Sequence, residues 1–277
     1  MAVTTQHAER YSFPLKHFVD MRGCQLHQLH LSMCSLEAVS AKLSGFSYLA
    51  SLSLHRVSVV DSVVLNIMSS CYALRRFGLQ RCHQLINNMR ISREKLVCLE
   101  VCGYFLGAFP KLRAVTLQFT TCLQVSRVLQ HSKRFAGLKN IELCLLTSWK
   151  TSLCSVAHIL KAAPLVKTHV LQVYGNLQPP CKLKIKWSKD CTLRRLHTIR
   201  IGGFSGEAEL MLLFSFLLKR SPVLKKLAID THQRKYQGFS IWKREKSEDA
   251  TRCYYARGVA LTHLPPKIPS TVTFRVK

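Results

Sequence analysis

Apolar residues recur along this chain in triplets whose members lie three residues and then two residues apart. The clearest copy spans 26–36 and reads L-x-x-L-x-L-x-x-C-x-L, the pattern of a leucine-rich repeat. A blurred copy lies near 165–173, and most copies begin about 22 to 28 residues apart, the length of one strand and its return segment. The further triplets are Leu49/Leu52/Leu54, Leu74/Phe77/Leu79, Leu96/Leu99/Val101, Leu112/Val115/Leu117, Leu138/Ile141/Leu143, Leu196/Ile199/Ile201 and Leu224/Leu227/Ile229.

This spacing predicts strands that stack side by side. The last two residues of each triplet are two apart, so in an extended strand they point to the same side. A single unit cannot bury that side alone, whereas neighbouring units can bury it together in a continuous core. We therefore predict an α/β fold, a leucine-rich-repeat solenoid with a curved parallel sheet and with helices and loops on its convex side.

The residue between the two inward positions of each strand should face the concave side, where a binding partner would lie. These residues are His30, Ser53, Gly78, Glu100, Thr116, Glu142, Arg200 and Ala228. From this row and the residues next to it, we predict the partner-binding residues His30, His55, Arg56, Gln80, Arg81 and Arg200.

Helical spacing predicts return helices that begin near Asp61, Thr120 or Thr121, Ser152 and Gly206. The last of these is the clearest and is predicted over 206–220, with Ser205 as its cap. Glutamates at its start and basic residues at its end suit the helix dipole.

The pattern also predicts three regions: a lead-in that caps the stack over 1–25, the solenoid over 26–232, and a basic polar loop with a C-terminal cap over 233–277. Two adjacent prolines make 176–181 a candidate break within the solenoid. Alternating apolar residues at Val272, Phe274 and Val276 predict a terminal strand that closes the stack.

The charge balance is strongly basic, with 41 Lys and Arg against 14 Asp and Glu and a formal net charge of +27. It indicates an acidic protein partner or another polyanion. Basic residues recur beside the triplets and could form a stripe along one edge, so nucleic-acid or polyanion binding is the alternative function. A solvated edge explains them more simply, because no aromatic residues interleave with them to stack bases.

No apolar run reaches the roughly 18 residues that a membrane span needs, and the first residues do not resemble a secretory signal. We therefore expect an intracellular protein, in the cytoplasm, the nucleus or both. The 12 cysteines are expected to remain thiols in such a compartment.

We expect no catalytic residues, metal or cofactor. Cys98 and Cys102 lack the paired spacing of a structural zinc site. The glycine-rich segment 202–206 lacks the Gly-Lys-Ser/Thr ending of a phosphate-binding loop. Acidic residues are too scarce for a convincing acid–base pair.

Several segments resemble the plant F-box/FBD/LRR-repeat protein family. They are Phe13-Pro14-Leu15, the repeat over 45–57, the segment Gly203-Phe204-x-Gly206-Glu207 with its continuation over 216–224, and 256–261. The resemblance places an FBD-like segment at about 196–232 and covers most of 10–277.

In that family an F-box docks on a Skp-type adaptor of a ubiquitin ligase, and the repeats hold the protein to be ubiquitinated. This sequence shows no L-P-x-x-x-L segment of F-box length before the repeats. The resemblance therefore implies a non-catalytic protein–protein interaction module, similar to the substrate-recognition region of an F-box adaptor, without adaptor binding of its own.

Overall fold

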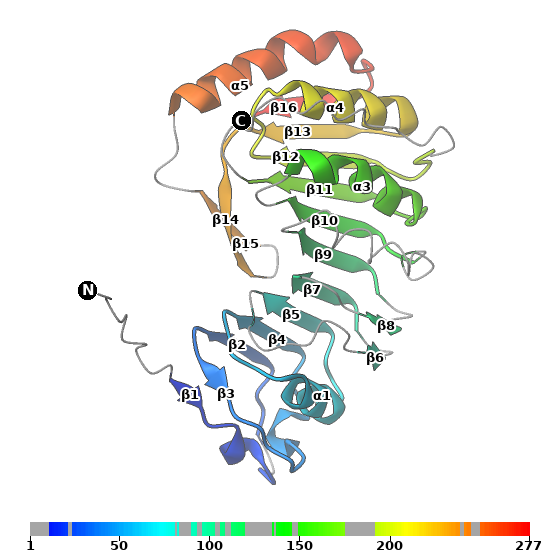
Figure 1. The fold of residues 1–277 in the computed structure, drawn as a ribbon. Coiled ribbons are helices and arrows are strands. Elements are labelled where there is room, and N and C mark those ends of the chain that lie inside the picture. The colour runs from blue at the N-terminus through cyan, green and yellow to red at the C-terminus, as the bar shows by residue number, and fades with distance from the viewer. Residues whose placement is uncertain are drawn as a thin grey trace, which may run out of the picture.

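The computed structural model describes residues 11–21, 24–80, 82, 90–92, 96–102, 106–108, 112–119, 135, 137–145, 149–174, 192–238, 241–244 and 250–277. Its main element is a ten-stranded parallel sheet that does not close into a barrel, in which each strand follows its predecessor in space (Figure 1). The predicted leucine-rich-repeat solenoid is thereby confirmed. Its strands in spatial order are β2 (Gln28–Ser32), β4 (Ser51–His55), β5 (Arg76–Gln80), β7 (Cys98–Cys102), β9 (Ala114–Phe119), β10 (Asn140–Leu145), β11 (Thr168–Val173), β12 (Thr198–Gly202), β13 (Lys226–Asp230) and β16 (Thr273–Val276).

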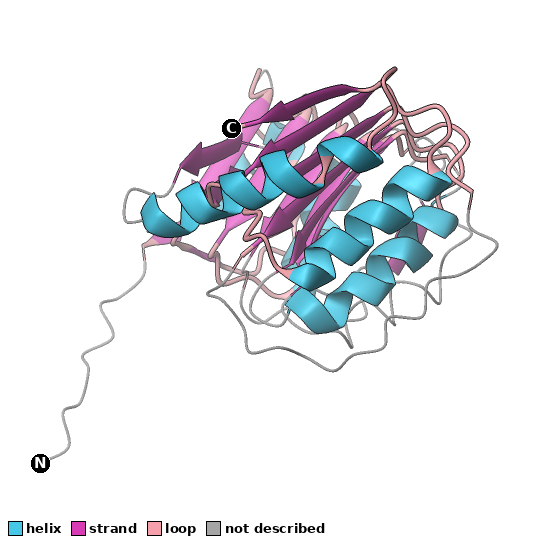
Figure 2. Ribbon diagram, turned by 90° about the horizontal axis from the view of Figure 1, so that it is seen from above, coloured by secondary structure: helices cyan, strands magenta, loops and turns pink. Residues whose placement is uncertain are grey.

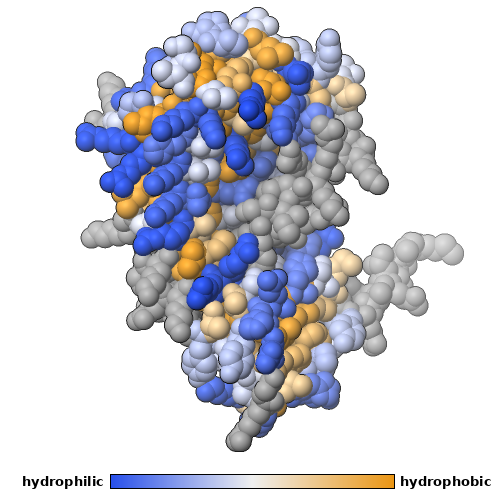
Figure 3. Space-filling model, turned by 180° about the vertical axis from the view of Figure 1, so that it is seen from behind, coloured by the Kyte–Doolittle hydropathy of each residue, from blue (hydrophilic) through white to orange (hydrophobic). Residues whose placement is uncertain are grey.

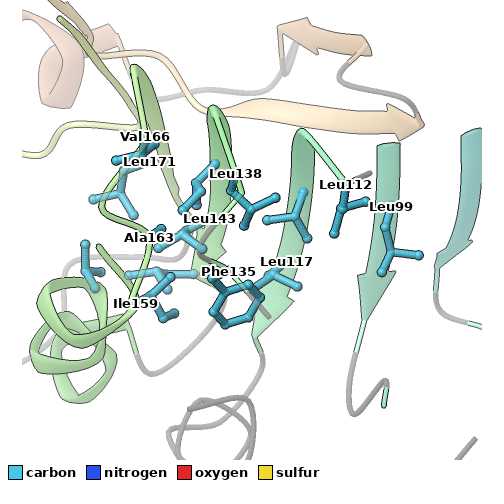
Figure 4. Close-up of a cluster of buried hydrophobic side chains, with 14 of the residues drawn as sticks. Leu99, Leu112, Leu117, Phe135, Leu138, Leu143, Ile159, Ala163, Val166 and Leu171 are labelled. Carbon is cyan, nitrogen blue, oxygen red and sulfur yellow. The ribbon is translucent and has the colours of Figure 1, made fainter. Parts of the chain in front are cut away.

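The triplet pattern fixes the register of the sheet, because equivalent positions of neighbouring strands pair along its whole length. Figure 4 shows apolar side chains of successive strands packed against one another and against Ile159 of the helical layer. The first inward column consists of Leu29, Leu52, Phe77, Leu99, Val115, Ile141, His169, Ile199, Leu227 and Phe274.

A left-handed turn directly follows several strands. Met33, Arg56 and Gly203 occupy this position with φ of 56°, 53° and 71°. The N–H of Met33 donates to the carbonyl of His55 at 3.0 Å, and the N–H of Arg56 donates to that of Gln80 at 2.8 Å. The turn therefore continues the parallel ladder of hydrogen bonds by one residue beyond the strands.

Helices cover one face of the sheet (Figure 2). They include α1 (Asp61–Ser70), α3 (Trp149–Lys161) and α4 (Ala208–Arg220). Asp61 is the first residue of α1 and not its cap, and α3 begins three residues before Ser152. The helix predicted near Thr120 or Thr121 lies outside the described residues.

The predicted cap of α4 is wrong. The N-cap is Glu207, and the hydroxyl of Ser205 donates to the Glu207 carboxylate (Oγ to Oε1, 3.2 Å) instead of accepting from the helix backbone. A carboxylate at this end of α4 is favourable because the helix dipole is positive there.

The N-terminal end of the stack is covered by aromatic packing. The ring of Phe18 stacks on that of Phe13 at 5.7 Å between centroids and lies 4.7 Å from that of Phe46. Phe18 ends the short helix η1 (Leu15–Phe18), and Phe46 ends η2 (Ser44–Phe46). Two short parallel pairs lie outside the main sheet: β1 (Ser12–Phe13) with β3 (Ser35–Leu36), and β6 (Arg90–Ser92) with β8 (Leu106–Ala108).

The C-terminal region is more regular than its sequence suggests. It contains the antiparallel hairpin β14 (Arg234–Gly238) and β15 (Ile241–Arg244), then α5 (Ala250–His263) and the short helix η4 (Pro265–Lys267). The predicted terminal strand is confirmed, because β16 pairs with β13 in parallel. The candidate break at 176–181 lies outside the described residues.

Candidate functional site

A groove of about 620 Å³ lies on the helix-free, concave face of the sheet, over strands β7 to β16. Its floor is formed by the outward-facing residues of these strands. Small side chains dominate the floor, which leaves the space above the sheet open. These small residues are Ala114, Thr116, Thr168, Val170, Thr198, Gly202, Ala228 and Thr273.

Four exposed cations rise from one end of the groove. Arg200 and Arg275 lie in the same row on either side of Ala228, so two strand spacings, about 10 Å, separate their backbones. Lys226 and Lys277 line the groove beside them. This end of the groove therefore presents concentrated positive charge to solvent.

The carboxylates in the groove are already engaged. Glu142 is 8% exposed and accepts a hydrogen bond from the hydroxyl of Thr116 at 3.4 Å. Asp230 accepts from the backbone N–H of His232 at 3.1 Å, and the imidazole Nδ1 of His232 lies 3.2 Å from the same oxygen. The exposed cations consequently dominate the charge offered to a partner.

The predicted row of outward-facing residues pairs in one continuous register from β2 to β13. The row gains Val170 from β11 and Arg275 from β16, which the triplet search did not supply. Within the row Ser53 is 1% exposed and Thr116 is 4% exposed, so a position on this face does not guarantee accessibility.

The structure separates the predicted binding residues. Of these, Arg200 lines the groove. His30, His55 and Arg56 belong to the first strands and the turn after β4, and six strand spacings, about 29 Å, lie between β4 and β12. Gln80 is only 3% exposed.

The sixth predicted binding residue, Arg81, lies outside the described residues. Sequence reasoning missed Lys226, Arg275 and Lys277, which the structure places beside Arg200. Alternating polar residues in the tail could have suggested Arg275. Its position next to β13 could not be foreseen.

A histidine replaces an aliphatic residue directly beneath this part of the sheet. His169 of β11 pairs with Ile141 and Ile199 in the first inward column and is fully buried. Neither ring nitrogen makes a hydrogen bond within the described residues. Burial lowers the pKa of His169 to about 4, and the backbone of Ile141 acts in the opposite direction by favouring the charged form.

On the opposite face an ion-pair cluster joins two helices. The ammonium of Lys150 in α3 lies 2.5 Å from Glu207 Oε2 and 3.2 Å from Glu209 Oε1. Desolvation disfavours the ammonium, but the hydrogen bonds to both carboxylates and their charges outweigh it and raise the pKa of Lys150. All three side chains are largely buried, so the cluster connects helices and does not form a surface site.

Nothing in the described part of the chain resembles a metal centre, since no three His, Cys, Asp or Glu side chains gather there. No disulfide joins the cysteines that the structure describes. None of the helices in these ranges is long and apolar enough to cross a membrane.

Comparison with known sequence families gives a match over the whole chain. The sequence pattern described as "At1g61320/AtMIF1, LRR domain" matches residues 1–106 and, in a second match, residues 105–277. The two matches together span the whole chain. No curated protein sequence matches the chain closely.

Proposed function

Because the chain belongs to the At1g61320/AtMIF1 LRR-domain family, we propose that it is a non-catalytic protein-interaction module that holds an acidic segment of a partner protein in the concave groove. The observation that carries this proposal is the pair of exposed guanidiniums, Arg200 and Arg275, on either side of Ala228. Guanidinium groups bind carboxylates through two parallel hydrogen bonds, which gives both charge and geometric selectivity.

The shape of the groove supports an extended segment as the occupant. Threonine, alanine and glycine residues keep the floor low, so a peptide could lie close to the sheet with its acidic residues toward the basic end. Complementary charge would accelerate association and reject basic competitors. His30, His55 and Arg56 remain proposed contacts for a partner long enough to extend beyond the groove.

The resemblance to F-box/FBD repeat proteins supports a narrower proposal. The chain would recognise its partner in the same way as the repeat regions of those proteins recognise the proteins destined for ubiquitination. We propose that these repeats supply recognition of the partner protein and do not themselves contact a Skp-type adaptor.

Affinity capture with matched charge variants tests the proposal. The variant Arg200→Glu/Arg275→Glu reverses two charges inside the groove. The control Lys16→Glu/Lys267→Glu makes the same charge change at exposed residues of η1 and η4, which do not line the groove. We expect proteins rich in acidic segments to be recovered at least fivefold less by the groove variant and normally by the control.

The same capture is expected to recover no Skp-type adaptor. Equal losses from both variants would mean that net charge, and not the groove, holds the partner. Stoichiometric adaptor recovery would contradict the adaptor-independent role.

A further inference from the structure

A ladder of basic residues runs along the edge of the sheet where the strands begin. Arg113, Lys139, Lys167, His197 and Lys225 each immediately precede a strand, from β9 to β13. Their backbones are joined directly, because the N–H of each residue donates to the carbonyl of the one before it at 2.9, 2.7, 2.9 and 2.9 Å. These five residues, here called the edge stripe, are therefore consecutive rungs about 4.8 Å apart.

The edge stripe is accessible and uncompensated. Arg113, Lys139, Lys167 and Lys225 are exposed, and His197 is half-buried. No carboxylate of the described residues forms an ion pair with any of the four exposed cations. Figure 3, which views the uncovered face of the sheet, shows strongly hydrophilic side chains gathered along the edge where the strands begin.

The same ladder of backbone hydrogen bonds continues toward the N-terminus, through Val97 to a further basic residue, Arg75. Val97 donates to the carbonyl of Arg75 at 2.8 Å, and Arg113 donates to that of Val97 at 3.0 Å. From Arg75 to Lys225 there are six steps, or about 29 Å. The guanidinium of Arg113 is held in place by a hydrogen bond from Nη1 to the carbonyl of Gly137 at 3.1 Å. The charges thus follow a line along a regular backbone.

We propose that the edge stripe binds the phosphate backbone of double-stranded nucleic acid without sequence specificity. A single line of basic residues at this spacing suits a linear polymer of closely spaced negative charges better than a planar surface. Duplex DNA carries one charge for about every 1.7 Å of its axis, so it can offer a phosphate to each rung.

The composition of the edge stripe favours phosphates over an acidic protein segment. Protein interfaces depend on aromatic or aliphatic anchors and are depleted in lysine. The five rungs from Arg113 to Lys225 include no apolar residue, and three of them are lysines. Among the residues between 113 and 225 whose side-chain exposure the structure describes, none is an exposed aromatic residue that could stack on unpaired bases, which favours a duplex over a single strand.

This inference goes beyond the proposed function and does not depend on it. The groove lies on the concave face and uses Arg200 and Arg275, whereas none of the five edge-stripe residues lines it. Loss of one activity through variants of its own residues should leave the other intact.

Fluorescence anisotropy with a labelled 20-base-pair DNA duplex of arbitrary sequence, measured over a salt series, tests the edge stripe. The variant Lys139→Ala/Lys167→Ala/Lys225→Ala removes three rungs. The control Lys16→Ala/Lys219→Ala/Lys267→Ala removes the same charge from exposed lysines elsewhere. We expect the stripe variant to bind at least tenfold more weakly, and the slope of log K against log salt to become shallower by about 0.9 for each phosphate that the variant no longer neutralises.

Two further comparisons make the result decisive. The variant Lys139→Arg/Lys167→Arg/Lys225→Arg keeps the charge and should bind the duplex like the unaltered chain. Polyglutamate and a single strand of equal length should each bind more weakly than the duplex. Equal loss in the two alanine variants, stronger binding of polyglutamate, or stronger binding of the single strand would overturn the proposal.

Discussion

At the scale of single residues, the structure deviates from its own repeat at His169. Every other position of its inward column is aliphatic or phenylalanine, whereas His169 is fully buried with no hydrogen-bonded ring nitrogen among the described groups. A polar group left unsatisfied in a core costs stability. The chain tolerates this cost because nine other strands supply regular apolar positions to the same column.

The pH dependence of stability follows from the lowered pKa of His169, about 4 against an ordinary 6.5. The unfolded chain binds a proton at this histidine more readily than the folded chain, so stability falls as pH decreases from 6.5 toward 4. The contribution of this one group is about 3 kcal/mol across that window.

We predict that His169→Ile raises the free energy of unfolding by about 1 to 2 kcal/mol at pH 7. The substitution restores the residue type of Ile141 and Ile199 and should also reduce the loss of stability between pH 6.5 and pH 4. Urea unfolding of both proteins at pH 7 and pH 5 measures both effects. A variant that is less stable and equally sensitive to acid would contradict this account, because it would mean that the buried imidazole of His169 stabilises the fold.

Gly203 is required by its backbone conformation. Its φ is +71°, and a Cβ at this position would lie 2.0 Å from the carbonyl oxygen of Val173. We predict that Gly203→Ala lowers the free energy of unfolding by at least about 2 kcal/mol, because backbone must move to accommodate the methyl group.

The matched control is Gly258→Ala in the middle of α5, where a Cβ would meet nothing within 4 Å. That substitution should stabilise the protein by about 0.5 to 1 kcal/mol through helix propensity. Urea unfolding compares the two variants. Similar effects at both positions would contradict the steric account of Gly203.

At the scale of elements, the helices are held to one another as well as to the sheet. Lys150 lies in the first turn of α3, and its carboxylate partners Glu207 and Glu209 lie at the start of α4. The N-terminal ends of α3 and α4, which both carry partial positive charge, therefore lie close together. The two carboxylates suit the dipole of α4, and the ammonium of Lys150 lies between them. The sequence predicted the glutamates as dipole partners but gave no sign of Lys150.

We predict that Lys150→Met lowers the free energy of unfolding by about 3 kcal/mol, because it leaves buried carboxylates without their cation. Lys219→Met, at an exposed position of α4, should change it by less than about 0.5 kcal/mol. Thermal and urea unfolding at pH 7 provide the comparison. If the two variants unfold alike, the cluster contributes no net stability.

The raised pKa of Lys150 gives the same cluster an alkaline signature. Its stabilisation should be complete below the ordinary lysine pKa of 10.5 and be lost as pH rises through the higher folded value. The difference in stability between the unaltered chain and Lys150→Met should therefore shrink only in strongly alkaline solution.

At the scale of the whole molecule, the apolar triplets predicted the parallel order and register because each triplet encodes one strand locally. They were weakest at β11, where His169 replaces the expected aliphatic residue. They missed α5, because its buried positions are the small residues Cys253, Ala256 and Ala260, which give little helical signal. Helices and strands could be recognised from the sequence where their buried residues are large and apolar.

The groove could not be predicted in the same way. Its depth depends on small side chains that align on five of the seven strands beneath it, and its basic end depends on β16 pairing with β13 after the intervening hairpin and helix. The pairing brings Arg275 and Lys277 beside Lys226 from about fifty residues away along the chain. Of the four cations at the basic end, Arg200 alone was predicted as a binding residue, because it lies inside a regular triplet.

The most direct test of the proposed docking surface is site-specific photocrosslinking of a captured partner. A photoreactive residue at Ala228 would lie on the groove floor, and one at Leu212, which is 52% exposed on α4, would serve as the control on the helical face. We predict efficient crosslinking to an acidic segment of the partner from Ala228 and none from Leu212. Crosslinking from Leu212 with none from Ala228 would contradict the account.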